Sequence, residues 1–96
     1  MAISLALGAN RFNDLSDPPL RVDYWVLNGG TVEVRVYNVA DVAVRHLSSA
    51  TMAPGAYTLY WDGKDDTGAP MASGLYLIAV TEPGRVDIKK VLVLKQ

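Results

Sequence analysis

Apolar and polar residues alternate along most of this chain with a period of two, which is the pattern of β-strands that bury one face. In the clearest run, Val32, Val34 and Val36 alternate with Glu33 and Arg35. Helical periodicity is nearly absent. Turn signals rich in Gly, Pro, Asn and Asp separate the alternating runs about every 8 to 12 residues. The pattern therefore predicts an all-β protein.

Seven alternating runs follow one another along the chain. Ile3, Leu5 and Leu7 predict an opening strand, and a loop rich in Asn, Asp, Ser and Pro follows it up to residue 19. The body of the domain, residues 20–96, carries six more predicted strands, over residues 22–26, 32–36, 43–48, 57–61, 76–80 and 86–94. We predict a single domain, 1–96, with the fold of a seven-stranded antiparallel Ig-like β-sandwich, and a small barrel is the alternative. Parallel pairing is not expected, because the chain has no helices for the crossovers.

The connections and the core follow from the same pattern. Asn28-Gly29-Gly30 predicts a tight β-hairpin. Residues 38–41 and 82–85 predict turns, residues 49–54 a loop, and residues 62–74 the longest irregular segment. Inward-facing positions on the predicted strands define the expected core: Val32, Val34, Val36, Tyr57, Leu59, Trp61, Tyr76 and Ile78.

Composition and charge exclude several classes of function. The 96 residues include nine basic and ten acidic side chains, and the basic ones are scattered, so no nucleic-acid interface is expected. No apolar run approaches the 18 residues that suggest a membrane span. The chain has no cysteine, which excludes disulfides and thiol chemistry. The apolar start of the chain lacks the positive charges of a signal peptide, so a strand is the preferred interpretation.

Three segments resemble a known family. Residues 36–47, residues 53–76 with Trp61-Asp-Gly-Lys-Asp-Asp-Thr-Gly68, and the ending 89–95 are similar to FlgD-type Ig-like domains. Residues 8–13 and 20–24 extend the resemblance over nearly the whole chain. Two positions depart from the family pattern: Arg11 replaces a usual proline, and Asp41 a usual glycine in a tight turn, although Asp tolerates left-handed backbone better than most residues.

The resemblance implies one of two settings. The first is a flagellar hook-cap scaffold, and the second is the C-terminus of a large secreted or cell-surface bacterial protein, where some such domains are similar to type IX secretion sorting domains. We expect a non-catalytic accessory module of the second kind, which serves sorting, attachment or spacing. Its expected partners are other domains of a parent protein or the secretion and cell-surface machinery. A carbohydrate-binding module that uses Trp25 or Tyr60 is the first alternative, and a self-assembling scaffold is the second.

The acidic loop after Trp61 is the candidate metal site. Asp62, Asp65 and Asp66 offer three carboxylates within five positions, and Ca²⁺ takes oxygen ligands. The spacing does not fit an EF-hand, and Asp and Gly also build hydrogen-bonded turns without a metal. We expect the turn network and keep calcium as the less favoured alternative. No other cofactor is expected.

No catalytic site is predicted. His46, the single histidine, lacks a nucleophile in a recognisable motif and a second histidine for a metal. Lys64 beside Asp65 raises the idea of an internal isopeptide bond, but its place in a loop argues against the burial that such bonds need. Small-molecule ligands are not expected, whereas a glycan remains an alternative.

A docking surface is the last candidate. Trp25 is out of phase with the core positions of its strand, whereas Trp61 is in phase and is expected to be buried. Leu27 shares the outward face with Trp25, and Leu75 and Leu77 are out of phase on a later strand. If these four side chains gather, they predict a surface that docks a neighbouring domain or partner.

Overall fold

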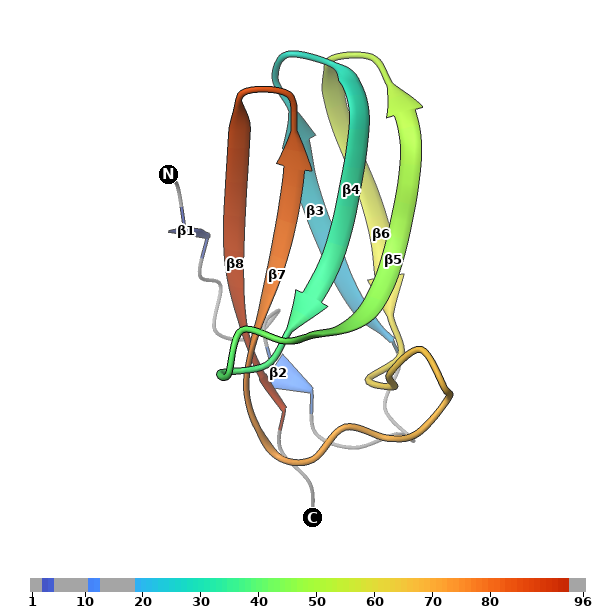
Figure 1. Cartoon of the computed structure of the whole chain (residues 1–96), viewed down its shortest axis with the longest axis vertical. Coiled ribbons are helices and arrows are strands. Elements are labelled where there is room, and N and C mark those ends of the chain that lie inside the picture. The colour runs from blue at the N-terminus through green and yellow to red at the C-terminus, as the bar shows by residue number, and fades with distance from the viewer. Residues whose placement is uncertain (1–2, 5–10, 13–18, 94–96) are drawn as a thin grey trace.

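The computed structural model describes residues 3–4, 11–12 and 19–93 and has two packed β-sheets (Figure 1). The larger sheet has the order β1-β8-β7-β4-β5, with β2 also paired to β8, and the smaller sheet pairs β3 with β6. No helix in the described residues could span a membrane. The strands are β1 (Ile3–Ser4), β2 (Arg11–Phe12), β3 (Leu20–Val26), β4 (Gly30–Tyr37), β5 (Ala43–Met52), β6 (Gly55–Trp61), β7 (Gly74–Glu82) and β8 (Arg85–Val93).

The predicted all-β sandwich is confirmed, but the strand count and the pairing need correction. Six long antiparallel strands, β3 to β8, make the sandwich, instead of seven. The predicted opening strand is described only at Ile3–Ser4, and its positions Leu5 and Leu7 lie outside the described residues. Both β1 and β2 pair with β8 in parallel, which we did not expect. No helical crossover is needed, because nearly the whole chain separates these segments from β8.

The core lies between the two sheets and follows the predicted phase. Of the eight predicted core residues, six are buried, while Tyr57 and Leu59 are partly buried and pack against the core. The Trp61 ring is fully buried and meets Tyr76 edge to face, with ring centroids 5.8 Å apart. The Tyr76 hydroxyl donates a 2.7 Å hydrogen bond to the carbonyl of Ala72, which anchors the long loop before β7, as in the tyrosine corner of sandwich folds.

Two connections differ from the predictions. Asn28-Gly29 does not form a hairpin, because β3 and β4 belong to different sheets and the turn crosses between the layers. The Glu82 carboxylate accepts hydrogen bonds from the backbone N–H groups of Leu27, Asn28 and Gly29, so a contact distant in sequence fixes this turn. The predicted loop 49–54 is also wrong in part, since β5 continues to Met52.

The turn between β4 and β5 gives a first testable prediction. Asp41 has φ of 64°, a left-handed conformation that strains residues with a Cβ atom. Asp41→Gly should therefore stabilise the domain by up to about 1 kcal/mol. Urea denaturation measures the change, and Ala40→Gly, at a neighbour without positive φ, is the matched control and should destabilise. A lower midpoint for Asp41→Gly would contradict the strain argument.

Candidate functional site

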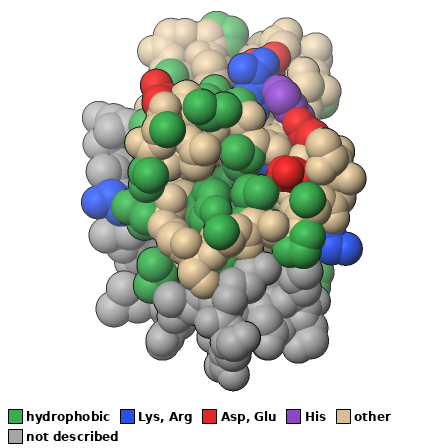
Figure 2. All heavy atoms as spheres, turned by 60° about the horizontal axis from the view of Figure 1, so that its bottom comes forward, with side chains coloured by type: hydrophobic (Ala, Val, Ile, Leu, Met, Phe, Trp, Pro, Cys, Tyr) green, Lys and Arg blue, Asp and Glu red, His purple; other side chains and the backbone are tan. Residues whose placement is uncertain are grey.

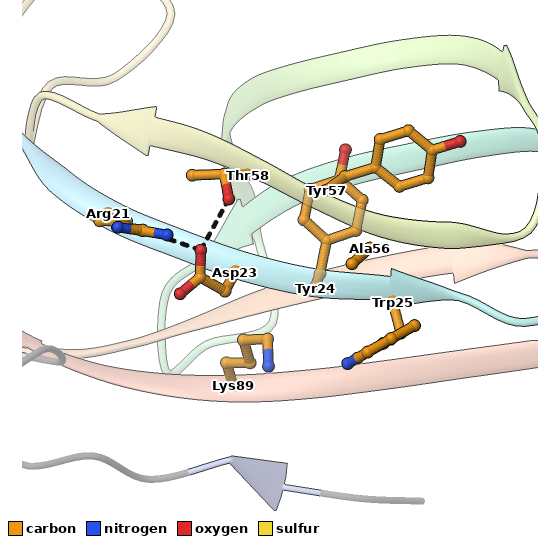
Figure 3. Close-up of a pocket in the computed structure, with 8 residues that line it drawn as sticks. All are labelled: Arg21, Asp23, Tyr24, Trp25, Ala56, Tyr57, Thr58 and Lys89. Carbon is orange, nitrogen blue, oxygen red and sulfur yellow. Dashed lines mark hydrogen bonds and ion pairs between the residues drawn. The ribbon is translucent and has the colours of Figure 1, made fainter.

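A groove of about 430 Å³ lies beside the free edge of β3 and reaches across to β8 (Figure 3). β3 pairs only with β6, so its other edge has no neighbouring strand in the described residues. Figure 3 shows Lys89 extending from β8 toward the side chains of β3. The lining residues are Arg21, Asp23, Tyr24, Trp25, Ala56, Tyr57, Thr58 and Lys89.

The strand phase explains why polar groups and one large ring meet here. Along β3, buried residues alternate with exposed ones, and Arg21, Asp23 and Trp25 occupy the exposed positions. The antiparallel register places them opposite Tyr60, Thr58 and Ala56 of β6. Trp25 is 64% exposed, as its phase predicts.

Asp23 is the electrostatic centre of the groove. Its Oδ1 accepts a 2.7 Å hydrogen bond from the Thr58 hydroxyl and a 2.9 Å bond from Arg21 Nε. The Thr58 hydrogen bond, followed by the Arg21 bond, holds the pKa of Asp23 below its ordinary value, and the charge of Lys89 acts in the same direction. The groove therefore presents an ionised carboxylate between two cations, next to an exposed aromatic ring.

The acidic loop after β6 is a hydrogen-bonded turn network. The Asp65 Oδ1 atom accepts bonds from the backbone N–H groups of Thr67 and Ala69 and from the Thr67 hydroxyl. Hydrogen bonds to Thr67 and Ala69 hold the pKa of Asp65 below its usual range. The Asp62 Oδ1 atom accepts the N–H of Lys64, whose carbonyl accepts the indole N–H of Trp61. The loop is thus tied both to itself and to the core.

Arg45 and His46 of β5 bind this loop to the larger sheet. Arg45 Nη1 donates to Asp62 Oδ1 and to the carbonyls of Lys64 and Asp65, at 3.1–3.2 Å. Asp66 accepts the backbone N–H of His46 at 2.9 Å and lies 2.6 Å from its Nδ1. Figure 2 shows the histidine, in purple, exposed beside acidic and basic side chains at this end of the molecule. His46 thus participates in a structural contact between the loop and the edge of β5.

The structure does not bring the three predicted calcium ligands together. Asp62, Asp65 and Asp66 each face different hydrogen-bond partners. Among the described residues, no group of three His, Cys, Asp or Glu side chains is placed to hold a metal ion. The arrangement is the turn network that the sequence analysis preferred.

Arg45→Met tests the network directly. The substitution removes three hydrogen bonds at a side chain that is only 26% exposed, so we expect a loss of about 1–2 kcal/mol in the free energy of unfolding. Arg21→Met, at a side chain 64% exposed, is the matched control and should change stability by less than about 0.5 kcal/mol. Millimolar calcium should leave the melting temperature of the wild type unchanged, whereas a rise would indicate a metal site.

The four residues of the predicted docking surface do not form one patch. Trp25 and Leu27 belong to or directly follow β3 of the smaller sheet, whereas Leu75 and Leu77 lie on β7 of the larger sheet. Outward faces of two packed sheets point in opposite directions. Leu77 instead lines a separate groove of about 260 Å³ with Val86 and Ile88. Trp25 remains as a candidate within the groove beside β3.

Two buried carboxylates were missed by the sequence analysis. Glu82 and Asp87 are 4% and 7% exposed, and both lie in phase with buried residues of their strands. Glu82 follows Tyr76, Ile78 and Val80 at the same spacing of two. That continuation of an apolar series by a charged residue was the available signal, since buried charges need partners.

Comparison with known proteins identifies a family and two solved structures that this domain resembles. Residues 26–84 match the FlgD Ig-like domain family. The structure resembles FlgD from P. aeruginosa, with 23% identity and a TM-score of 0.60 over 85% of this chain and 65% of that chain. It also resembles dimeric latent PorU from Porphyromonas gingivalis, with 19% identity and a TM-score of 0.54 over 79% of this chain and 8% of that chain. No curated protein matches the sequence. The domain spans less than two thirds of either solved chain.

Proposed function

Because this chain belongs to the FlgD Ig-like domain family, we propose that it is a non-catalytic accessory module of a larger secreted or cell-surface bacterial protein. In that protein it serves sorting, attachment or spacing. The observation that carries the proposal is the partial coverage of its structural relatives, because a similar sandwich makes up 8% of the PorU chain and 65% of the FlgD chain. A domain of this kind works as one part of a longer chain.

The internal chemistry supports a structural role. The acidic loop, the histidine and the arginine beside it are engaged in hydrogen bonds that hold β5 and the loop together. The groove beside β3 contains an ion pair, a hydroxyl and an exposed ring, and these groups suit binding better than bond cleavage. Partner recognition at the groove fits a module that attaches its parent protein to something else.

Domain deletion in the parent protein separates the three roles. If the domain sorts, its deletion should stop export, and if it attaches, the truncated protein should be exported but released into the medium. If it only spaces, an unrelated Ig-like sandwich of similar size should restore the wild-type distribution. Fractionation and immunoblotting measure these outcomes. Unchanged export and surface retention after deletion would overturn sorting and attachment.

Carbohydrate binding is a second candidate, because two exposed aromatic rings share the outer face of the smaller sheet. Trp25 is 64% and Tyr60 60% exposed, and the register places them four residues apart along the strands, about 13 Å. Exposed aromatic rings this far apart can stack on two separate, non-adjacent sugars of one chain. A glycan array should then show binding that Trp25→Ala and Tyr60→Ala each abolish, and a blank array with the wild type would remove the candidate.

A further inference from the structure

The edge of β3 beside the groove presents a row of backbone groups. In an antiparallel pair, the N–H and C=O groups of alternate residues point away from the partner strand. Arg85 Nη1 of β8 donates a 3.4 Å hydrogen bond to the Trp25 carbonyl, and β8 belongs to the other sheet, so we infer that this carbonyl points away from β6. By the same alternation, the backbone groups of Arg21 and Asp23 point into the groove.

A buried carboxylate oxygen without a hydrogen-bond partner lies on β8, two residues from Lys89. Asp87 is on the same face of β8 as Lys89, its side chain is 10% exposed, and its Oδ1 has no hydrogen-bond partner in the described residues. Its Oδ2 is 3.7 Å from Arg85 Nη2, the same guanidinium that reaches Trp25. An unpaired buried carboxylate oxygen costs free energy, but Asp87 is not among the residues that line the groove, so Lys89 is the residue of β8 that defines the binding site.

We propose that the groove binds an extended segment of a partner polypeptide, which adds to the smaller sheet as a third strand beside β3. Strand addition uses the backbone groups of an exposed sheet edge for affinity and side-chain pockets for specificity. The larger sheet already pairs in this manner, because the short segments β1 and β2 lie along β8. This inference deepens the attachment role proposed above by naming the site and the class of its partner.

The groove also specifies the side chains of that partner. Lys89 favours an acidic residue on the face of the added strand that turns toward β8. The Trp25 ring lies at the rim, where it packs on the added strand. The expected ligand is an extended peptide with an acidic residue on the face that turns toward Lys89.

Selection from a phage-displayed random peptide library tests the proposal with the whole chain as bait. Selected peptides should carry an acidic residue at a common position. In NMR titrations with one such synthetic peptide, the amides of Arg21, Asp23 and Trp25 should shift most. Asp23→Pro removes the backbone N–H of residue 23 at a sheet edge, where proline is tolerated. It should weaken peptide binding about tenfold or more in calorimetry.

Charge reversal and a control outside the groove keep the test decisive if Asp23→Pro fails to fold. Lys89→Glu should weaken the binding of the same peptide. Replacing the acidic residue of the peptide with lysine should restore its affinity for the Lys89→Glu variant. Val39→Ala, at an exposed position in the turn between β4 and β5 and outside the groove, should leave affinity unchanged. The proposal is overturned if no peptide is selected, if Lys89→Glu has no effect, or if Val39→Ala abolishes binding. If no peptide binds the groove but deletion of the domain still releases the parent protein from the cell surface, this binding site is refuted and the proposed function stands.

Concentration-dependent dimers in sedimentation velocity that Lys89→Glu disrupts would identify a second copy as the occupant instead, and would also overturn the proposal of a separate partner.

Discussion

Trp61→Ala is expected to destabilise the domain by about 3–5 kcal/mol, a large share of the total stability of an ordinary small protein. The Trp61 side chain is fully buried between the sheets, and its ring packs against Tyr76. Its indole N–H also donates a 2.9 Å hydrogen bond to the carbonyl of Lys64. The substitution therefore leaves a cavity and removes the bond that joins the acidic loop to the core.

Urea denaturation followed by circular dichroism measures the loss, and Trp25→Ala is the matched control. Trp25 is the same residue type at 64% exposure, so its removal should change stability by less than about 0.5 kcal/mol. Trp61→Phe should fall between the two, because it keeps an aromatic ring but loses the hydrogen bond. Equal losses at both tryptophans would show that the burial assigned to Trp61 is wrong.

Glu82→Gln should lower the melting temperature by several degrees at neutral pH. The Glu82 carboxylate accepts three backbone N–H groups of the turn between β3 and β4, at 2.6–3.1 Å, and pairs with Arg85. Glutamine has one acceptor oxygen and no charge, so part of this set is lost. The turn joins the two sheets, so the loss of its hydrogen bonds should destabilise the whole sandwich. Thermal unfolding of both proteins measures the difference.

The same comparison has a predicted pH dependence. Hydrogen bonds from the backbone of Leu27, Asn28 and Gly29 and from Arg85 hold the pKa of Glu82 below its ordinary value. A lowered folded-state pKa contributes stability above the unfolded-state pKa, about 4.3 for glutamate, and loses it as the pH falls through the folded value. The advantage of the wild type over Glu82→Gln should thus be full at pH 7 and shrink below about pH 4.3. A difference that stays constant in acid would refute the role of the charge.

Local sequence determined the strands and the core of this protein. A side chain in a strand faces one side or the other according to its phase, so the alternation of Val32, Val34 and Val36 sufficed to place them inside. Trp61 and Trp25 were assigned to the core and the surface on the same basis. Asp41 departs from the glycine usual in the family pattern, and its left-handed backbone, with φ of 64°, became evident only in the structure.

Tertiary structure decided which strands pair and what the polar residues do. Asn28-Gly29 suits a hairpin, but Glu82, more than fifty residues away, binds the turn so that β3 and β4 lie in different sheets. The three loop carboxylates were close in sequence, yet their partners come from β5 and from the loop itself. Trp25 and Leu77 are each out of phase with the core residues of their own strand, but they lie on opposite outer faces of the sandwich.

The docking site illustrates the same division. The sequence determined that Trp25 is exposed, because its phase depends only on its neighbours along the strand. That it stands at an edge without a neighbouring strand in the described residues, and opposite Lys89, depends on the packing of β3 over β8. The face of a strand on which a side chain lies follows from its position along that strand alone. Sheet edges, buried charges and grooves exist only once distant segments pack together.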